Sequence, residues 1–209
     1  MKAQFQPFPV LLTKRLQLRQ MQDRDSPELF EQRTMPEMLT YTEIKPPENE
    51  EEVVRFIQKI NDSISQNASI YWGLSLQNQA KLMGTICLWN LSPETNSAEI
   101  GFSLHPEFQK QGFMQEALKA VLAFGFGKME LDTIKAYSQP ENIPSLKLLQ
   151  NHGFEFKEKS TSTTCIQIII FLLRCDARLQ VQSKVQRLNL FLKVIILYLI
   201  HDQAIANGF

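Results

Sequence analysis

The segment from His105 to Ala120, HPEFQKQGFMQEALKA, constrains the fold more than any other part of the chain. It joins a strand-like run that ends at Leu104 to a helix-like run that begins near Phe113, with Gly112 in the turn. A helix N-terminus leaves backbone N–H groups without partners and carries positive potential, so such a turn can bind phosphate or pyrophosphate. A plain strand-to-helix turn fits the same residues. The glycine patterns typical of nucleoside triphosphate and NAD sites are missing.

Strand-like and helix-like runs alternate along the rest of the chain. Period-two patterns predict strands at 11–21, 68–76, 81–91, 98–104, 133–138 and 154–158. Helical spacing and capping residues predict helices at 26–35, 50–64, 116–129 and 143–153, the last one closed by Gly153. This order predicts an α+β domain built on one mixed sheet.

The net charge argues against nucleic acid as a partner. The chain has 22 Lys and Arg against 22 Asp and Glu, whereas nucleic-acid binding needs an excess of basic side chains. The balance is uneven, because residues 1–159 hold 17 basic and 20 acidic side chains and residues 160–209 hold 5 and 2. The two parts of the chain therefore differ in character.

Cysteine and histidine are too sparse to predict a disulfide framework or a metal site. Cys87, Cys165 and Cys175 show no paired spacing, which favours a reducing cytoplasm. His105 and His152 lack neighbouring ligand residues, so we expect surface positions for them and no metal. Cys87 lies between Ile86 and Leu88, as expected for a residue packed in a sheet.

The C-terminal part is rich in Ile and Leu. Residues 165–174 are suited to a last strand, and the tail beyond them has apolar residues at approximately helical spacing. Its apolar runs are about half the roughly 20 residues of a membrane helix, and Lys193 interrupts the second, which argues against a span. Three interpretations stay open: a helix packed on the sheet or on a dimer partner, a lipid-surface element, or sequence from a disrupted reading frame.

Two motifs in this chain are similar to those of the GCN5-related N-acetyltransferase (GNAT) superfamily. Gln109 to Met114 matches most of its Q/R-x-x-G-x-G/A loop, with Met114 where the family has Gly or Ala. Glu141 to Phe154 resembles its N-x-x-[AS]-x-x-L-x-x-x-x-G-F signature. With the start LTKRLQLRQM, the chain resembles the RimJ/RimL-like branch of ribosomal-protein alanine N-acetyltransferases. The resemblance runs from about Phe8 to Glu158 and implies a mixed, mostly antiparallel sheet, with helices on both faces and a V-shaped splay between its fourth and fifth strands.

The resemblance implies acetyl-coenzyme A as co-substrate. Its pyrophosphate would lie on the backbone amides of Gln111, Gly112, Phe113, Met114 and Gln115, and a side chain at position 112 would block that approach. The family motif also includes Gln109. The pantetheine arm would pair with Phe102, Ser103 and Leu104 and contact Asn142 and Ser145. Asn142 is equally suited to cap a helix.

Acetyl transfer to an amine requires a proton acceptor and donors for the oxyanion. Glu99, on the predicted fourth strand, is the candidate base; a solvated strand residue is the alternative. Many relatives have a Tyr acid where this chain has Leu149, which leaves Ser145 as a weak substitute. The residues that could line an amine pocket are Tyr41, Glu43, Trp72 and Trp89, and Glu43 could recognise an ammonium.

We therefore expect an acetyltransferase domain over residues 8–174, followed by an atypical apolar tail over 175–209. The predicted activity is acetyl transfer to a primary amine, either a protein N-terminus or a small molecule, in the cytoplasm and by a monomer or homodimer. A non-catalytic module that binds acyl-coenzyme A or a partner protein is the alternative. A membrane-associated interaction protein that uses the tail is a third possibility.

Overall fold

The computed structural model describes residues 1–42, 44–161 and 167–174. Glu43 and the 175–209 tail, both named in predictions above, lie outside these residues. The described helices are the 3₁₀ turns η1 and η2 and five α-helices: η1 (Asp23–Asp25), α1 (Ser26–Thr34), α2 (Pro36–Leu39), α3 (Glu50–Ser65), η2 (Pro106–Phe108), α4 (Phe113–Gly127) and α5 (Ile143–Asn151). The strands are β1 (Leu11–Leu12), β2 (Leu16–Arg19), β3 (Ile70–Leu76), β4 (Gly84–Ser92), β5 (Ser97–Leu104), β6 (Thr133–Ser138), β7 (Glu155–Thr161) and β8 (Gln167–Arg174).

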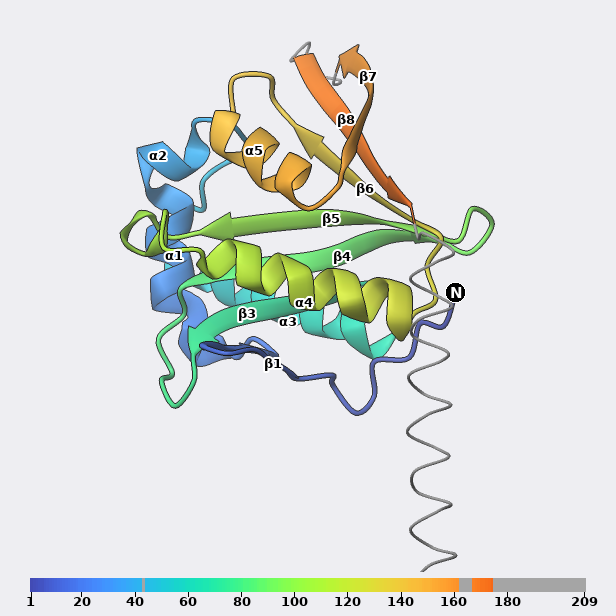
Figure 1. Cartoon of the computed structure of the whole chain (residues 1–209). Coiled ribbons are helices and arrows are strands. Elements are labelled where there is room, and N and C mark those ends of the chain that lie inside the picture. Colours follow the sequence, from blue (N-terminus) through green and yellow to red (C-terminus); the bar gives the residue numbers. More distant parts are fainter. Residues whose placement is uncertain (43, 162–166, 175–209) are drawn as a thin grey trace, which may run out of the picture. The chain divides into compact units, whose positions relative to one another are not determined.

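The strands form one mixed sheet in the order β1-β2-β3-β4-β5-β6-β8-β7, as Figure 1 shows. All neighbouring pairs are antiparallel except β5 and β6, which are parallel. The prediction of a mixed, mostly antiparallel α+β sheet is confirmed. The predicted last strand is present as β8, paired with β6.

The predicted strand over residues 11–21 is wrong, because it is a hairpin. Thr13 interrupts it: its backbone N–H donates to Leu16 O at 3.0 Å, and its hydroxyl accepts from the Leu16 N–H at 2.9 Å. The chain therefore reverses between β1 and β2. The alternation of apolar residues is the same in a hairpin and in a continuous strand, so the pattern alone does not reveal the turn.

Helices cover both faces of the sheet. On one face α4 packs on residues such as Trp72, whose ring lies 5.4 Å from that of Phe124 in a T-shaped contact. On the other face α1 and α3 enclose a smaller core that includes Leu29 and Ile57. The start of α3 follows from its sequence, because the Asn49 side chain accepts from the Glu52 N–H at 3.0 Å. In the described part of the chain, no helix is both long and apolar enough to cross a membrane.

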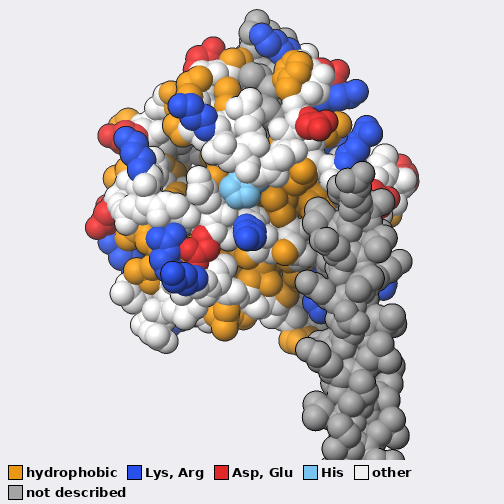
Figure 2. Space-filling model, viewed as in Figure 1, with side chains coloured by type: hydrophobic (Ala, Val, Ile, Leu, Met, Phe, Trp, Pro, Cys, Tyr) orange, Lys and Arg blue, Asp and Glu red, His pale blue; other side chains and the backbone are white. Residues whose placement is uncertain are grey.

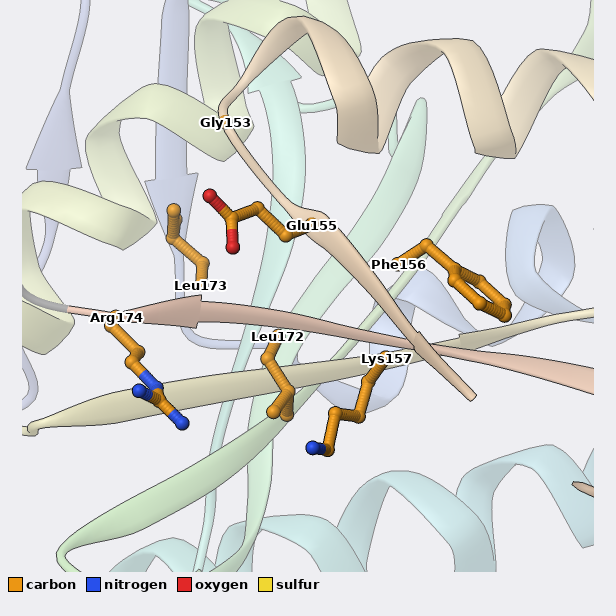
Figure 3. Close-up of a pocket in the computed structure, with 7 residues that line it drawn as sticks. All are labelled: Gly153, Glu155, Phe156, Lys157, Leu172, Leu173 and Arg174. Carbon is orange, nitrogen blue, oxygen red and sulfur yellow. The ribbon is translucent and has the colours of Figure 1, made fainter. Parts of the chain in front are cut away.

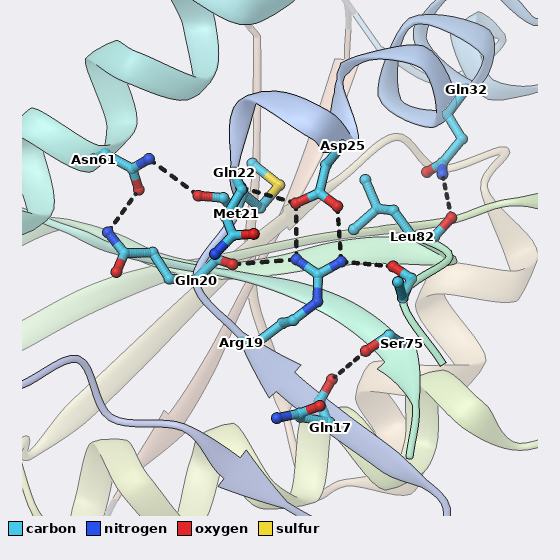
Figure 4. Close-up of polar contacts among 11 residues, drawn as sticks. Gln17, Arg19, Gln20, Met21, Gln22, Asp25, Gln32, Asn61, Ser75 and Leu82 are labelled. Carbon is cyan, nitrogen blue, oxygen red and sulfur yellow. Dashed lines mark hydrogen bonds and ion pairs between the residues drawn. The ribbon is translucent and has the colours of Figure 1, made fainter. Parts of the chain in front are cut away.

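A buried ion pair joins β2 to the start of α1 (Figure 4). The Arg19 guanidinium donates to both carboxylate oxygens of Asp25, each at 2.7 Å, and the two side chains are 11% and 3% exposed. Asp25 also accepts from the Gln22 N–H at 2.8 Å, and Arg19 donates to Gln20 O and Ala80 O. Both charges are therefore satisfied by partners on three segments of the chain.

We expect Asp25→Ala to lower the free energy of unfolding by about 3–5 kcal/mol, because the change leaves the buried Arg19 guanidinium without its carboxylate partner. Chemical denaturation of the full chain measures this loss. The matched control is Glu48→Ala, which removes the exposed Lys45–Glu48 pair and should cost less than about 1 kcal/mol. Equal losses in the two variants would show that the buried pair has no special role in stability.

Candidate active site

The sheet splits where β5 and β6 stop pairing. Their parallel register runs from Ser97 opposite Thr133 to Ile100 opposite Ala136. Beyond this point β6 pairs only with β8, and β5 pairs only with β4. Figure 1 shows β6 turning away from β5, with α4 and α5 on either side of the opening. The splay implied by the resemblance is confirmed.

A turn with open backbone amides lies beside the splay. Lys110 and Gly112 have positive φ angles of 60° and 79°, and α4 begins at the next residue, Phe113. The first intrahelical bond of α4 runs from Glu116 N to Gly112 O at 3.1 Å. The N–H groups of residues 112–115 precede that bond and have no intrahelical acceptor. They form a concentrated set of donors suited to an anion.

The β1–β2 hairpin fixes this turn through Glu116. The Glu116 carboxylate accepts from the Thr13 hydroxyl at 2.5 Å and from the Arg15 backbone N–H and Nε at 2.7 Å each. Arg15 also donates to Gln111 O at 3.0 Å, and its guanidinium lies 4.2 Å from the centre of the Phe113 ring. Thr13 and Arg15 were not predicted as site residues, because no local motif marks a contact about a hundred positions away along the chain.

The predicted cofactor-binding residues lie around the turn and the open half of β5. The Gln109 side chain donates to Leu104 O at 2.8 Å, and that of Gln111 donates to Glu107 O at 2.8 Å, so both amides stabilise the turn. Met114 is 8% exposed and packs in the core, so its side chain points away from the open amides. The remaining predicted residues of this group are the half-buried Phe102 and Ser103, the buried Leu104 and Phe113, and the exposed Gln115.

The start of α5 carries Asn142 and Ser145. The Asn142 side chain accepts from the Ser145 N–H at 3.2 Å, which confirms its predicted cap. Leu149, at the position of the family's Tyr acid, is fully buried. His152 is half-buried, and its ring nitrogens lie 2.8 Å from Leu148 O and 3.2 Å from Gln115 O, so it joins the end of α5 to the start of α4. The expected surface position of His152 is therefore only partly correct.

Glu99 lies on the face of β5 opposite α4 and is 9% exposed. One of its oxygens accepts from Asn90 Nδ2 at 2.6 Å. Asn90 has a φ of 45° and lies at an irregularity in β4, where the register shifts between Trp89 and Ser92. Bulges of this kind redirect side chains near functional sites. Glu99 is therefore a buried strand residue, and the solvated alternative is wrong.

Tyr41, Trp72 and Trp89, the predicted acceptor residues that the structure describes, differ in their environments. Trp89 is 49% exposed and lies opposite Glu99 on β4, and Tyr41 is 39% exposed. Trp72 is fully buried and its indole N–H donates to Pro9 O at 2.8 Å, so assigning it to the amine pocket was wrong. Its position on β3 turns its side chain toward α4 and Phe124.

Tyr137 was missed and lies on the same face as Glu99. Burial, the Glu99 charge and a hydrogen-bonding interaction with the Glu99 side chain raise the pKa of Tyr137, and Glu158 adds to the shift. Nearby, burial raises the pKa of the Cys87 thiol to about 12, so at neutral pH the thiol is protonated and is not a nucleophile. The period-two alternation of side chains along β6 places Tyr137 and Lys135 on one face of the sheet. This alternation is the sequence signal that could have identified Tyr137.

Two further surface features lack a defined set of chemical groups. A hollow at the β7–β8 end of the sheet is lined by both strands and Gly153, with Glu155, Phe156 and Arg174 among its side chains (Figure 3). On the face that carries α4, basic and acidic side chains are interspersed (Figure 2). No group of three potential metal ligands is present among the described residues.

Comparison with known proteins gives a consistent result. Residues 15–155 match the family model described as an acetyltransferase (GNAT) domain. The uncharacterised N-acetyltransferase YoaA of Bacillus subtilis is 32% identical over 148 residues, which cover 71% of this chain and 84% of YoaA. The N-acetyltransferase p20 of Bacillus licheniformis, also uncharacterised, is 31% identical over 145 residues, which cover 69% of this chain and 82% of p20.

Solved structures share the fold. The ribosomal-protein-S5-alanine acetyltransferase of Vibrio fischeri superposes with a TM-score of 0.72 at 19% identity, covering 81% of this chain and 98% of that one. RimL, a ribosomal L7/L12 α-N-protein acetyltransferase solved with coenzyme A, gives a TM-score of 0.73 at 16% identity, covering 81% and 99%.

The Glu116 interactions predict a pH-dependent contribution to stability. Burial raises the pKa of this carboxyl, but hydrogen bonds from Thr13 and Arg15 and the Arg15 charge outweigh burial and hold the pKa below its usual value. The stabilisation is therefore complete above the unfolded-state pKa and is lost as the pH falls through the folded-state pKa.

We expect Glu116→Gln to lower the free energy of unfolding by about 1–2 kcal/mol at pH 7, with the difference from wild type shrinking in acid. Denaturant titrations from neutral to acidic pH measure this difference. The control is Glu51→Gln on α3, where the carboxylate is 86% exposed. A difference that does not change with pH would rule out the ionic explanation.

Proposed function

The chain belongs to the GNAT acetyltransferase family, and from this premise we propose that it transfers an acetyl group from acetyl-coenzyme A to a primary amine in a ternary complex. The acceptor is a protein N-terminal amine or a small-molecule amine. One observation carries the proposal: the unpaired half of β5 opens next to the free amides of residues 112–115. A cofactor with a diphosphate group and an amide-containing arm fits this combination of donors and unpaired strand edge.

The turn is suited to the pyrophosphate. Gly112 has no side chain that could block the approach to the amides. Arg15 places a positive charge beside Gly112, because a Cβ at this position would lie 3.5 Å from a terminal nitrogen of Arg15. Phe102 to Leu104 would pair with the pantetheine arm and hold the acetyl carbonyl. Asn142 and Ser145 lie at the start of α5, where they would contact the same arm.

Glu99 is the proposed base. The acceptor ammonium gives one proton to Glu99, directly or through a water, and its lone pair then attacks the acetyl carbonyl carbon. As the tetrahedral intermediate collapses, the C–S bond breaks and the electron pair leaves on the thiolate sulfur. The nitrogen releases its second proton, which the thiolate takes up. Coenzyme A thiolate is a good leaving group, so Ser145 is at most an auxiliary acid where Leu149 replaces the family's Tyr.

Calorimetry with acetyl-coenzyme A, followed by thiol-release assays on N-terminal peptides and small amines, tests the proposal. Cofactor binding together with thiol release in the presence of an amine supports it. Binding without release for any amine would favour the non-catalytic acyl-coenzyme A module. No binding at millimolar cofactor would contradict both functions.

We expect Gly112→Ala to raise the Kd for acetyl-coenzyme A about tenfold or more, because the added methyl group obstructs contacts between phosphate and amides. The positive φ also makes alanine strained there, so a thermal melt must accompany the calorimetry. Gly127→Ala in the last turn of α4 is the control, because a Cβ there meets nothing within 4 Å. Equal affinity in the two variants would exclude the turn as the phosphate site.

We expect Glu99→Gln to lower kcat at neutral pH about 100-fold or more, with little change in the Kd for acetyl-coenzyme A, because the variant loses its proton acceptor. Steady-state thiol release and calorimetry measure the two effects. Glu107→Gln, on the exposed η2 turn, should leave kcat unchanged. An unchanged kcat for Glu99→Gln would remove Glu99 from the mechanism.

A further inference from the structure

Glu99 is a buried carboxylate that lacks a basic partner. It is 9% exposed and accepts a hydrogen bond from Asn90, yet it joins none of the ion pairs among the described residues. Lys135 lies opposite Glu99 in the β5–β6 register but is not paired with it. Buried carboxylates are rare without a cation beside them. A cation from outside the chain would therefore balance the charge of the Glu99 carboxylate.

Two exposed aromatic rings stand on either side of this carboxylate. Trp89, 49% exposed, lies directly opposite Glu99 on β4. Tyr137, 42% exposed, lies on β6 two residues beyond Lys135 and interacts with Glu99. The two strands flank β5, and the faces of such rings attract cations.

Gly101 lies on β5, between the strands that carry the two rings. It is the next β5 residue on the Glu99 face and the first one beyond the last β5–β6 pair. A Cβ at this position would lie 3.2 Å from Cys87 Sγ and 3.9 Å from Trp89 Nε1. The Trp89 indole therefore lies close to the point where the splay opens, on the same face of the sheet as Glu99 and Tyr137.

We propose that Trp89, Tyr137 and Glu99 form a receptor for an organic ammonium ion. The inference rests on the proposed function, because the ion is then the acceptor amine in its protonated form, bound before Glu99 removes the proton. The two rings select the positive charge through their faces, and Glu99 supplies the opposite charge. A neutral molecule of the same shape lacks both attractions.

Tryptophan fluorescence of the full chain tests this receptor without any turnover. The probes are n-butylammonium chloride and n-butanol, titrated at constant ionic strength in the absence of acetyl-coenzyme A. Of the two tryptophans, Trp72 is fully buried and Trp89 is half exposed, so the response reports on Trp89. Trp89→Phe should abolish the signal and thereby confirm its source.

We expect a saturable response to butylammonium and a Kd for butanol at least about tenfold higher. Tyr137→Leu should raise the butylammonium Kd about 2- to 5-fold, whereas Tyr137→Phe, which keeps the ring, should stay within about twofold of wild type. Glu99→Gln should raise it about tenfold or more. Phe156→Leu, on another exposed aromatic residue, is the matched control and should change nothing.

Equal affinity for butanol and butylammonium would overturn the receptor, and so would the absence of a saturable response. Unchanged affinity in both Tyr137→Leu and Glu99→Gln would also overturn it. Failure of the proposed function is seen separately, because acetyl transfer requires the cofactor and this titration does not. Ammonium binding without acetyl transfer would therefore support the receptor and contradict the enzyme.

Discussion

Backbone hydrogen bonding between β5 and β6 ends at Ile100 and Ala136, and the arrangement of the site depends on where it ends. Strand N–H and C=O groups require partners, so an inner strand with one unpaired edge is stable only if water or a ligand completes it. In this fold β8 pairs with the far edge of β6 along its whole length, so β6 stays in the sheet where its pairing with β5 has ended. The opening is therefore built into the sheet and does not depend on a mobile segment.

Two side-chain interactions define the opposite sides of that opening. On one side, Glu116 ties the hairpin to the first turn of α4, so that the free amides keep their direction. On the other side, the irregularity at Asn90 turns an amide toward Glu99 and holds the carboxylate in place. One face thus presents donors for an anion and the other presents an acceptor with aromatic neighbours, which suits two substrates of opposite charge that meet at a strand edge.

Local patterns predicted those parts of the molecule whose causes are local. Helix α3 follows from its cap at Asn49 and its apolar spacing, and the turn at Gly112 follows from a glycine between a strand and a helix. Trp72 was misassigned because the sheet face toward which a strand residue points depends on the register of that strand. The register in turn depends on the partner strand, which a local pattern does not identify. Arg15, Asn90 and Tyr137 were missed for the same reason: each gains its role only from residues brought near by the fold.

The contacts of Thr13 and Arg15 with Glu116 span about a hundred positions of the chain. Closing such a distance costs chain entropy, so these contacts depend on the sheet between them being in place. The strand, turn and helix of residues 98–127 carry the recognisable motif, but Thr13 and Arg15, which hold the turn through Glu116, lie outside them. The proposed phosphate recognition would thus be a property of the finished domain, and a peptide cut from around the motif would lack the Thr13 and Arg15 contacts that orient its amides.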